Sequence, residues 1–123
     1  MSLTTRKMSD KHEEHLVALF GGRMTKGSGN QWHNQMDGRQ SSREQYWAFA
    51  WDGKSTLGKS VGVTREMWTK AVQQAGVERP MLPLRWYNNE RLEVGLDLAV
   101  VLADDLACLI EDANAYRAAK EAS

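Results

Sequence analysis

The chain has one cysteine, Cys108, among its 123 residues. A single cysteine forms no internal disulfide, builds no zinc ribbon and suits a reducing compartment. Because Cys108 lies in an apolar helical pattern, we expect it to be a small core residue. The chain also has no apolar run long enough to cross a membrane, and residues 1–15 lack the apolar centre of a signal peptide. These absences predict a cytoplasmic protein with no membrane partner.

Histidine is also scarce, with three residues, and this excludes several catalytic designs. The HEEH sequence at 12–15 separates its histidines by three positions, whereas the helical zinc-protease motif separates them by four. Trp32-His33-Asn34 suggests a nuclease with a histidine nucleophile, but no later histidine completes such a site. No serine-histidine-aspartate arrangement follows from these positions.

Net charge is absent as well, because 16 Lys and Arg balance 16 Asp and Glu. A simple nucleic-acid binder is usually basic. The charges are unevenly spread, however: residues 22–75 hold eight basic residues against four acids, and residues 76–123 hold five against nine. Such a distribution is compatible with one face turned toward an anionic polymer.

Length and an ordinary hydrophobic content of 41% predict one domain with a modest core, spanning residues 1–123. Alternating helix and strand patterns predict an α/β fold, a small mixed sheet flanked by helices. The core should cover about residues 10–102, followed by a helix at about 104–119. The expected helices run from Ser9 or Asp10 to Phe20, from Arg65 to Ala75 between a Thr64 cap and Gly76, and from an Asp104 cap to about Ala119.

The strand pattern predicts a central strand at 46–51 and a buried strand at 96–102. Residues 79–87 also form a strand pattern, but Pro80 and Pro83 remove backbone donors from it. Proline is confined largely to edge strands, so we expect this segment at an edge of the sheet. Shorter strands are expected at 23–25 and 60–63.

Residues 36–54, MDGRQSSREQYWAFAWDGK, carry the clearest chemical pattern. Asp37 follows an apolar residue, and Asp52 and Lys54 stand two residues apart at the end of the expected central strand. In an extended segment these two side chains point the same way. Two carboxylates brought together hold a hard divalent cation through oxygen, and the ammonium then lies beside the same pocket. The pattern is typical of metal-dependent phosphodiesterases and predicts a magnesium-dependent nuclease.

Two further features each allow a functional and a purely structural interpretation. Glu13 lies on the apolar face of the first helix, where an acid needs a partner or a metal. Glu13 and Glu14 equally suit the first turn of a helix, where acids favour the helix dipole. The glycine-rich loop at 26–30 is either an ordinary surface loop or a phosphate contact, whose donors would be Lys26, Ser28 and Asn30.

A competing motif overlaps the same stretch. Residues 53–60, GKSTLGKS, match the phosphate-binding loop pattern, and residues 100–104, VVLAD, resemble the acid-ended strand that accompanies it. Such a loop requires a helix that starts at its Lys-Ser. Residues 61–63, Val-Gly-Val, disfavour a helix there. We therefore rank a nucleotide-binding protein second.

Taken in order, Glu13, the Gly-Ser-Gly loop, Asp37 and Asp52-Gly53-Lys54 resemble the PD-(D/E)xK nuclease superfamily. The likeness is greatest to its small Holliday junction resolvases of archaeal and phage type, and it spans about residues 10–87. The resemblance implies a restriction-endonuclease-like αβββαβ core. The chain departs from the pattern at Asp52, where many relatives have Glu, and at Gly53, which replaces an apolar strand residue.

The resemblance implies a structure-selective DNA endonuclease that uses Mg²⁺, with Mn²⁺ as a substitute, and no nucleotide cofactor. Asp37, Asp52 and the backbone carbonyl of Gly53 would bind the metal, and Lys54 would orient or activate the attacking water. Glu13, or Glu14 in its place, would complete the acidic cluster. The DNA contacts implied are Arg23, Lys26, Ser28, Asn30, Arg39 and Lys59.

Symmetric cutting of a four-way junction needs two sites, and a chain of 123 residues is too small to hold both. The resemblance therefore implies a homodimer. By elimination, its interface is expected on the Trp-rich strands and on residues 79–87. A DNA-binding module without catalysis is a third hypothesis, and it predicts binding with no metal-dependent cleavage.

Overall fold

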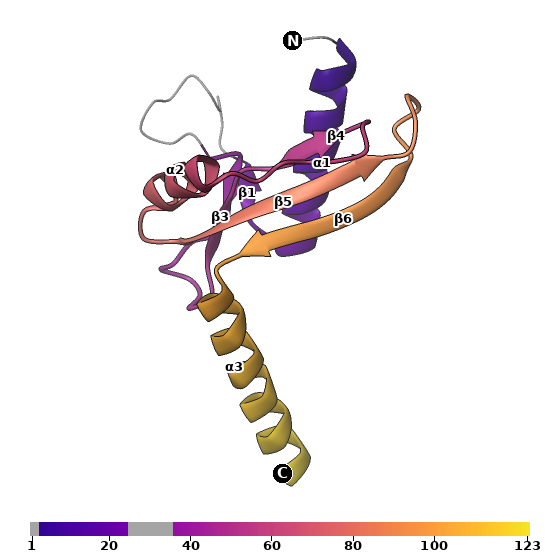
Figure 1. The fold of residues 1–123 in the computed structure, drawn as a ribbon. Coiled ribbons are helices and arrows are strands. Elements are labelled where there is room, and N and C mark those ends of the chain that lie inside the picture. The colour runs from indigo at the N-terminus through magenta and orange to yellow at the C-terminus, as the bar shows by residue number, and fades with distance from the viewer. Residues whose placement is uncertain (1–2, 25–35) are drawn as a thin grey trace.

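The computed structural model describes residues 3–24 and 36–123. Three helices and six strands form within these residues (Figure 1). None of these helices is both long enough and apolar enough to cross a membrane. In chain order the elements are α1 (Leu3–Phe20), β1 (Arg23–Met24), β2 (Gly38–Arg39), β3 (Phe49–Trp51), β4 (Lys54–Thr56), α2 (Arg65–Ala75), β5 (Arg79–Tyr87), β6 (Val94–Val101) and α3 (Ala103–Ala122).

The described strands form one mixed sheet, as the α/β pattern predicts. Strands β1, β2 and β3 are successive antiparallel neighbours. Strand β5 then lies parallel to β3 and to β4, which pair with successive parts of the same edge of β5. Strand β6 pairs antiparallel with the other edge of β5 along almost its whole length. Strands β3 and β4 thus act as one strand that is interrupted at Asp52-Gly53.

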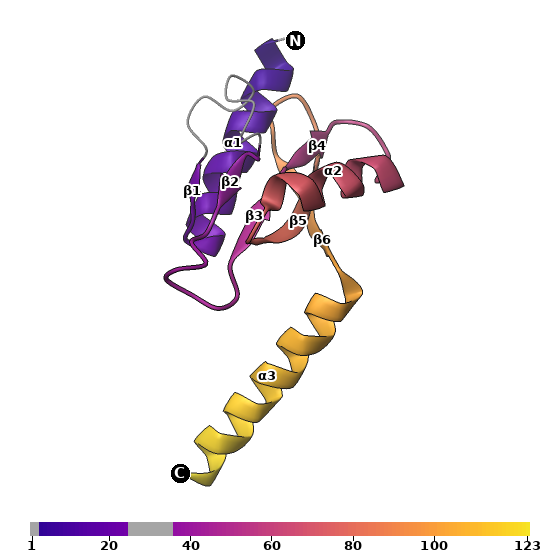
Figure 2. The same cartoon turned by 90° about the vertical axis from the view of Figure 1, so that its left-hand side faces the viewer.

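Helices α1 and α2 lie on opposite faces of this sheet, as Figure 2 shows. The alternation of side chains along a strand supplies each face with its own apolar group. Leu16 of α1 packs with Trp51 and Met81 on one face. Ala71 and Ala75 of α2 pack with Met36, Ala50 and Leu82 on the other.

The second helix matches its prediction, whereas the bounds of the other two differ. Thr64 caps α2 by accepting a hydrogen bond from the Met67 backbone N–H, and Gly76 ends the helix with a positive φ. Helix α1 begins at Leu3, well before Ser9, and α3 follows Leu102 with no side-chain cap from Asp104. Both extensions are polar or alanine-rich turns, which carry little apolar periodicity for the sequence to display.

The strand expected at 60–63 is wrong: residues 57–64 are irregular, and the strand lies instead at Lys54–Thr56. Parallel pairing with Leu84–Trp86 of β5 selects the earlier segment. Val61 and Val63 favour a strand at 60–63 locally, but the long-range pairing with β5 outweighs that preference.

The segment 79–87 has the predicted bounds, but it is the central strand and not an edge. Its odd-numbered backbone groups face β3 and β4, since Arg79 N–H donates to Ala48 and the Met81 carbonyl accepts from Asp52. Pro83, which has no backbone N–H, therefore stands opposite the break between the end of β3 and the start of β4. Pro80 faces the other edge, where β6 ends at Val101. Each proline falls at a gap in the neighbouring strand.

Two further expectations are wrong for one shared reason. The β6 segment is largely exposed and not buried, and Cys108 is exposed and not a core residue. Helix α3 leaves the domain and does not fold back over β6 (Figure 1). The apolar residues of β6 and α3 consequently remain on the surface.

Candidate active site

Asp37 and Asp52 meet because neighbouring antiparallel strands bring them together. Asp37 directly precedes β2, and its backbone N–H donates to the Trp51 carbonyl at 2.9 Å. Asp52 directly follows β3. The Asp37 Oδ2 accepts a hydrogen bond of 2.8 Å from the Gly53 backbone N–H. The Asp37 carboxylate therefore holds the interrupted backbone between β3 and β4 in place.

Lys54 joins the two acids from the first position of β4. Its Nζ lies 3.1 Å from Asp52 Oδ2, and both side chains are partly exposed to solvent. The expectation that residues two apart on an extended segment share a face is thus confirmed for this pair. The ion pair lies at the surface end of the site, where a substrate could reach the ammonium.

Glu13 adds a third carboxylate from α1. Its side chain is in hydrogen-bonding contact with Asp37, while the neighbouring Glu14 is exposed. Burial raises the pKa of Glu13, and the negative charges of Asp10 and Asp52 act in the same direction. Of the two acids that the sequence left open, the structure places Glu13 in the cluster.

Asp37 lies at the centre of this acidic cluster. Burial, followed by the negative charges of Asp52 and Glu13, raises the pKa of Asp37 to about 8. The hydrogen bond from Gly53 opposes this rise. Crowded carboxylates that resist ionisation together are stabilised by a cation placed between them. The charge balance of the cluster, three acids against one ammonium, thus suits a bound cation.

The donor set also bears on which cation would fit. Three carboxylates offer oxygen ligands alone, and oxygen is the ligand that Mg²⁺ and Mn²⁺ prefer. Within residues 3–24 and 36–123, no three acidic, histidine or cysteine side chains are arranged to hold one ion. Asp37 and Asp52 instead point to Gly53 and Lys54. Any ion held here would therefore take some of its ligands from groups other than these side chains.

Without divalent cations, we expect the free energy of unfolding to fall as the pH rises from about 5 to 8. Asp37 has a raised pKa in the folded state, so its contribution is complete below about pH 4 and is lost as the pH passes about 8. The slope should approach, but not exceed, about 1.4 kcal/mol per pH unit for each such group. Urea unfolding in EDTA at several pH values measures it, and a flat profile would contradict the raised pKa.

His12 lies directly beneath the site and was missed by the sequence-based prediction. It is buried, and burial together with the positive charge of Arg85 lowers its pKa to about 4. A Cβ on Gly53 would lie 3.1 Å from His12 Nδ1 and 3.3 Å from Leu16 Cδ1. Gly53 therefore lets the backbone rest on α1. The helical spacing of Met8, His12 and Leu16 was the available signal.

An ion pair between buried Arg85 and the more exposed Asp97 lies behind His12. Arg85, 2% exposed, donates from Nε and Nη2 to the two carboxylate oxygens of Asp97 at 2.6 and 2.9 Å. This pair lowers the pKa of Asp97. His15 reaches the same carboxylate at 3.6 Å. The pair joins β5 to β6 and holds in place the part of the sheet on which α1, and with it Glu13, lies.

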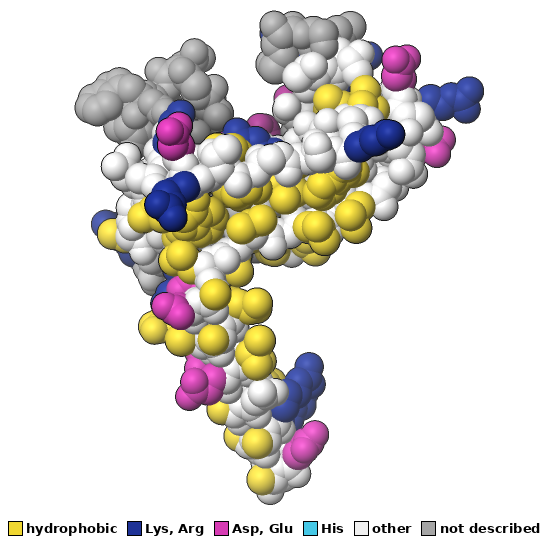
Figure 3. All heavy atoms as spheres, in the orientation of Figure 1, with side chains coloured by type: hydrophobic (Ala, Val, Ile, Leu, Met, Phe, Trp, Pro, Cys, Tyr) yellow, Lys and Arg dark blue, Asp and Glu magenta, His cyan; other side chains and the backbone are white. Residues whose placement is uncertain are grey.

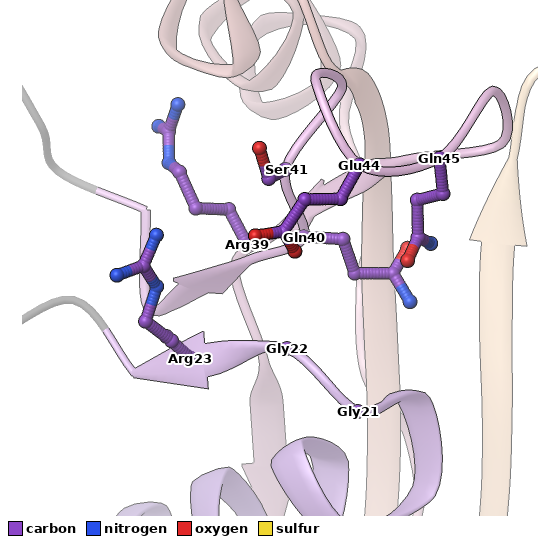
Figure 4. A pocket seen from close by; sticks show the side chains of 8 residues that line it. All are labelled: Gly21, Gly22, Arg23, Arg39, Gln40, Ser41, Glu44 and Gln45. Atoms are coloured by element: carbon purple, nitrogen blue, oxygen red, sulfur yellow. The ribbon is translucent and has the colours of Figure 1, made fainter.

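Two of the predicted DNA contacts, Arg23 and Arg39, line a polar pocket of about 310 Å³ at the end of α1. Figure 4 shows both arginines at one end of the pocket and Gln45 at the other. Arg39 is engaged within the protein, donating to Glu78 Oε1 at 2.9 Å and to the Gln74 carbonyl at 3.0 Å. Arg23 is exposed and is the better placed of the two to contact an anion.

The remaining predicted contacts are scattered. Lys59 is exposed within the irregular segment 57–64, and its carbonyl accepts a hydrogen bond from Trp86 Nε1. Helix α2 begins at Arg65, so no helix starts at Lys59-Ser60 as a phosphate-binding loop requires. The other three predicted contacts lie outside the described residues: Lys26, Ser28 and Asn30.

No protein-family model, no curated protein and no solved structure matches this chain. The candidate site therefore depends on its own geometry. That geometry brings Glu13, Asp37, Asp52 and Lys54 together from α1 and from the ends of β2, β3 and β4.

Proposed function

We propose that this chain is a metal-dependent endodeoxyribonuclease of the PD-(D/E)xK type, acting on four-way DNA junctions. The observation that carries the proposal is the meeting of Asp37, Asp52 and Lys54 at the interruption between β3 and β4. The element order is compatible with it when β3 and β4 are counted as one interrupted strand: a helix, three antiparallel strands, a helix, and a strand parallel to the third. The resemblance implies a core of αβββαβ order.

The proposed metal ligands are the carboxylates of Asp37 and Asp52 and the carbonyl of Gly53, with Mg²⁺ or Mn²⁺ as the ion. When bound, the ion would supply Lewis-acid stabilisation of the phosphate and acidify the attacking water. Binding a cation would also remove the repulsion that raises the pKa of Asp37. No nucleotide cofactor is required.

Hydrolysis forms a bond between the water oxygen and phosphorus and breaks one phosphorus–oxygen ester bond. Lys54 is placed to hold that water or the phosphate, because its ammonium lies at the exposed end of the cluster. It also offsets the negative charge that develops on the phosphate oxygens. Glu13 orients Asp37 through their contact, and its carboxylate can accept a proton from the water.

A junction-cleaving enzyme acting inside the cell would need two such sites, and so a homodimer. Its recognition of branched DNA would depend on phosphate contacts, for which Arg23 at the polar pocket is exposed. The nucleotide-binding alternative is less well supported. The eight residues of GKSTLGKS contribute β4 and an irregular segment, and the next helix begins at Arg65.

The test is cleavage of a labelled four-way junction, with the matching linear duplex as comparison, in Mg²⁺, in Mn²⁺ and in EDTA. We expect paired cuts in the junction that disappear in EDTA and in Asp52→Asn. Glu14→Gln is the matched control, since Glu14 is one residue from Glu13 but exposed, and it should cut as the wild type does.

Each alternative has its own outcome in the same experiment. Equal cutting of the duplex would keep the nuclease and remove the junction preference. Junction binding without cutting in either metal would support the DNA-binding module. ATP binding that is lost in Lys59→Ala, together with no cleavage, would establish the nucleotide-binding reading.

A further inference from the structure

Helix α3 leaves the domain as a long and largely uncovered arm. Figures 1 and 2 show it extending away from the sheet in both views. Every residue from 110 to 122 is exposed. Its 20 residues span about 30 Å, and a helix of this kind gains most of its stability from packing an apolar face. The described part of the chain supplies no such packing beyond the first turns.

The first half of α3 is held firmly in its direction. Arg79 Nη1 donates to Asp105 Oδ1 at 2.7 Å, and Trp47 Nε1 donates to Asp112 Oδ2 at 2.9 Å. The Arg79 guanidinium also lies 4.0 Å from the centre of the Trp47 ring. These contacts fix one side of the helix to the start of β5 and to the loop before β3. The arm is therefore displayed in a defined orientation.

An apolar surface remains beside these contacts. Leu106, 49% exposed, and Ile110, 52% exposed, stand four residues apart and lie on one side of α3, and Tyr116, 62% exposed, lies about 80° around the helix from Leu106. Exposed Leu96 and Leu98 form a separate apolar strip on the face of β6 that carries α2, the face shared by Val100 and Leu82. Figure 3 shows hydrophobic side chains running along the strands and continuing down the helix. A patch of this extent on a soluble domain marks an interaction site.

A groove lies at the base of α3, on the face of the sheet that carries α1. It measures about 450 Å³ and is lined by apolar side chains of α1, β3, β6 and α3 and of the loop before β3. Those used in the argument are Phe20, Trp47, Phe49, Val101, Leu106 and Leu109. A groove between a helix and a sheet can accept a second helix lying alongside the first.

The charges on α3 show which helix would fit. The half from 103 to 112 has four acids, Asp104, Asp105, Glu111 and Asp112, and no base. The half from 113 to 122 has Arg117 and Lys120 against Glu121. An antiparallel copy of α3 places the basic half beside the acidic half, whereas a parallel copy opposes like charges. The surface is thus complementary to itself under a two-fold axis.

We propose that α3 pairs antiparallel with α3 of a second copy of this chain, around a two-fold axis near Ala113. The second half of the partner helix lies along the first half of α3 and covers the apolar groove. The pairing would supply the second active site that paired cuts in a junction need. That relevance, though not the pairing itself, rests on the proposed function. The surface argument itself uses none of the acidic-site residues.

The test is the molecular mass in solution, measured by light scattering and sedimentation equilibrium without DNA or metal. We expect a dimer at micromolar concentration. Ile110→Glu should raise the dissociation constant about a hundredfold or more, because it buries an unpaired charge in the pairing surface. Ala115→Glu lies about 140° around the helix from Ile110 and should stay dimeric. Tyr116→Ser, in the fully exposed half, provides a second variant that leaves the core of the monomer untouched.

Orientation is tested by cysteine cross-linking in a Cys108→Ser background. Ala113→Cys should form a disulfide-linked dimer, whereas two copies of Leu106→Cys, 14 residues apart in the antiparallel pair, lie about 21 Å apart and should not. A monomeric wild type would overturn the proposal, as would a dimer unaffected by both Ile110→Glu and Tyr116→Ser. Efficient cross-linking at position 106 would overturn the antiparallel arrangement. A dimer without nuclease activity would overturn only the proposed function.

Discussion

Replacing Asp37 with asparagine is expected to slow junction cleavage about a thousandfold while stabilising the cation-free fold at pH 8. In the proposed mechanism a bound metal ion lowers the activation barrier by several kcal/mol, and each 1.4 kcal/mol is about tenfold in rate. The amide is a poor metal ligand, so that contribution is lost. The amide oxygen still accepts the hydrogen bond from Gly53, and the repulsion from Asp52 and Glu13 disappears. Activity and stability should therefore change in opposite directions.

Asp37→Ala is the matched control, because it removes both the charge and the acceptor. It should lose cleavage to the same extent but should be less stable than Asp37→Asn, since the Gly53 N–H then has no partner. Single-turnover cleavage and urea unfolding in EDTA give the two measurements. Normal cleavage by Asp37→Asn would place the metal site elsewhere. A less stable Asp37→Asn at pH 8 would contradict the electrostatic account of the cluster.

Gly38→Ala is expected to destabilise the fold by about 3 kcal/mol, at the upper end of the usual cost of overpacking a core. A Cβ at Gly38 would lie 2.6 Å from Cε2 and Cζ2 of Trp51. Trp51 is fully buried against Leu16 and Phe20, so the indole has no space to retreat. Because Gly38 follows Asp37 directly, any shift of β2 also moves a proposed ligand.

Gly62→Ala provides the comparison within the same chain. A Cβ at Gly62 meets no atom within 4 Å, so the free energy of unfolding of this variant should lie within about 0.5 kcal/mol of the wild-type value. The double variant Gly38→Ala/Trp51→Phe tests the cause, because the smaller ring gives space to the new methyl group. We expect Gly38→Ala to lower the free energy of unfolding by at least about 1 kcal/mol less when residue 51 is phenylalanine, because substitutions at residues in direct contact are not additive. Additive costs would exclude the clash.

The local chemistry of the site was predictable from the sequence because it depends on short-range rules. Alternation along an extended segment placed Asp52 and Lys54 on one face. The capping pattern fixed α2 between Thr64 and Gly76. The alternative acids Glu13 and Glu14 could not be separated, since one residue on a helix turns the side chain by about 100° and only the position of the sheet decides which is buried.

Features that depend on long-range pairing were not predictable. The edge position assigned to 79–87 followed from its prolines, and the sequence does not show that each proline faces a gap in a neighbouring strand. The burial expected for β6 and for Cys108 assumed that every apolar run is covered by its own chain. His12 was passed over because its importance comes from Gly53, 41 positions further along the sequence.

Pro83 has a consequence for anyone wishing to rebuild this site in another protein. In β5 it stands opposite the break between β3 and β4, on the side where its neighbours Arg79 and Met81 bond to β3. A residue with an N–H there would offer the Asp52 carbonyl a regular ladder bond and favour an uninterrupted strand. Transplanting the acids and the lysine alone would therefore give one continuous strand without the break. The transplanted site needs a proline at the matching position of the neighbouring strand as well.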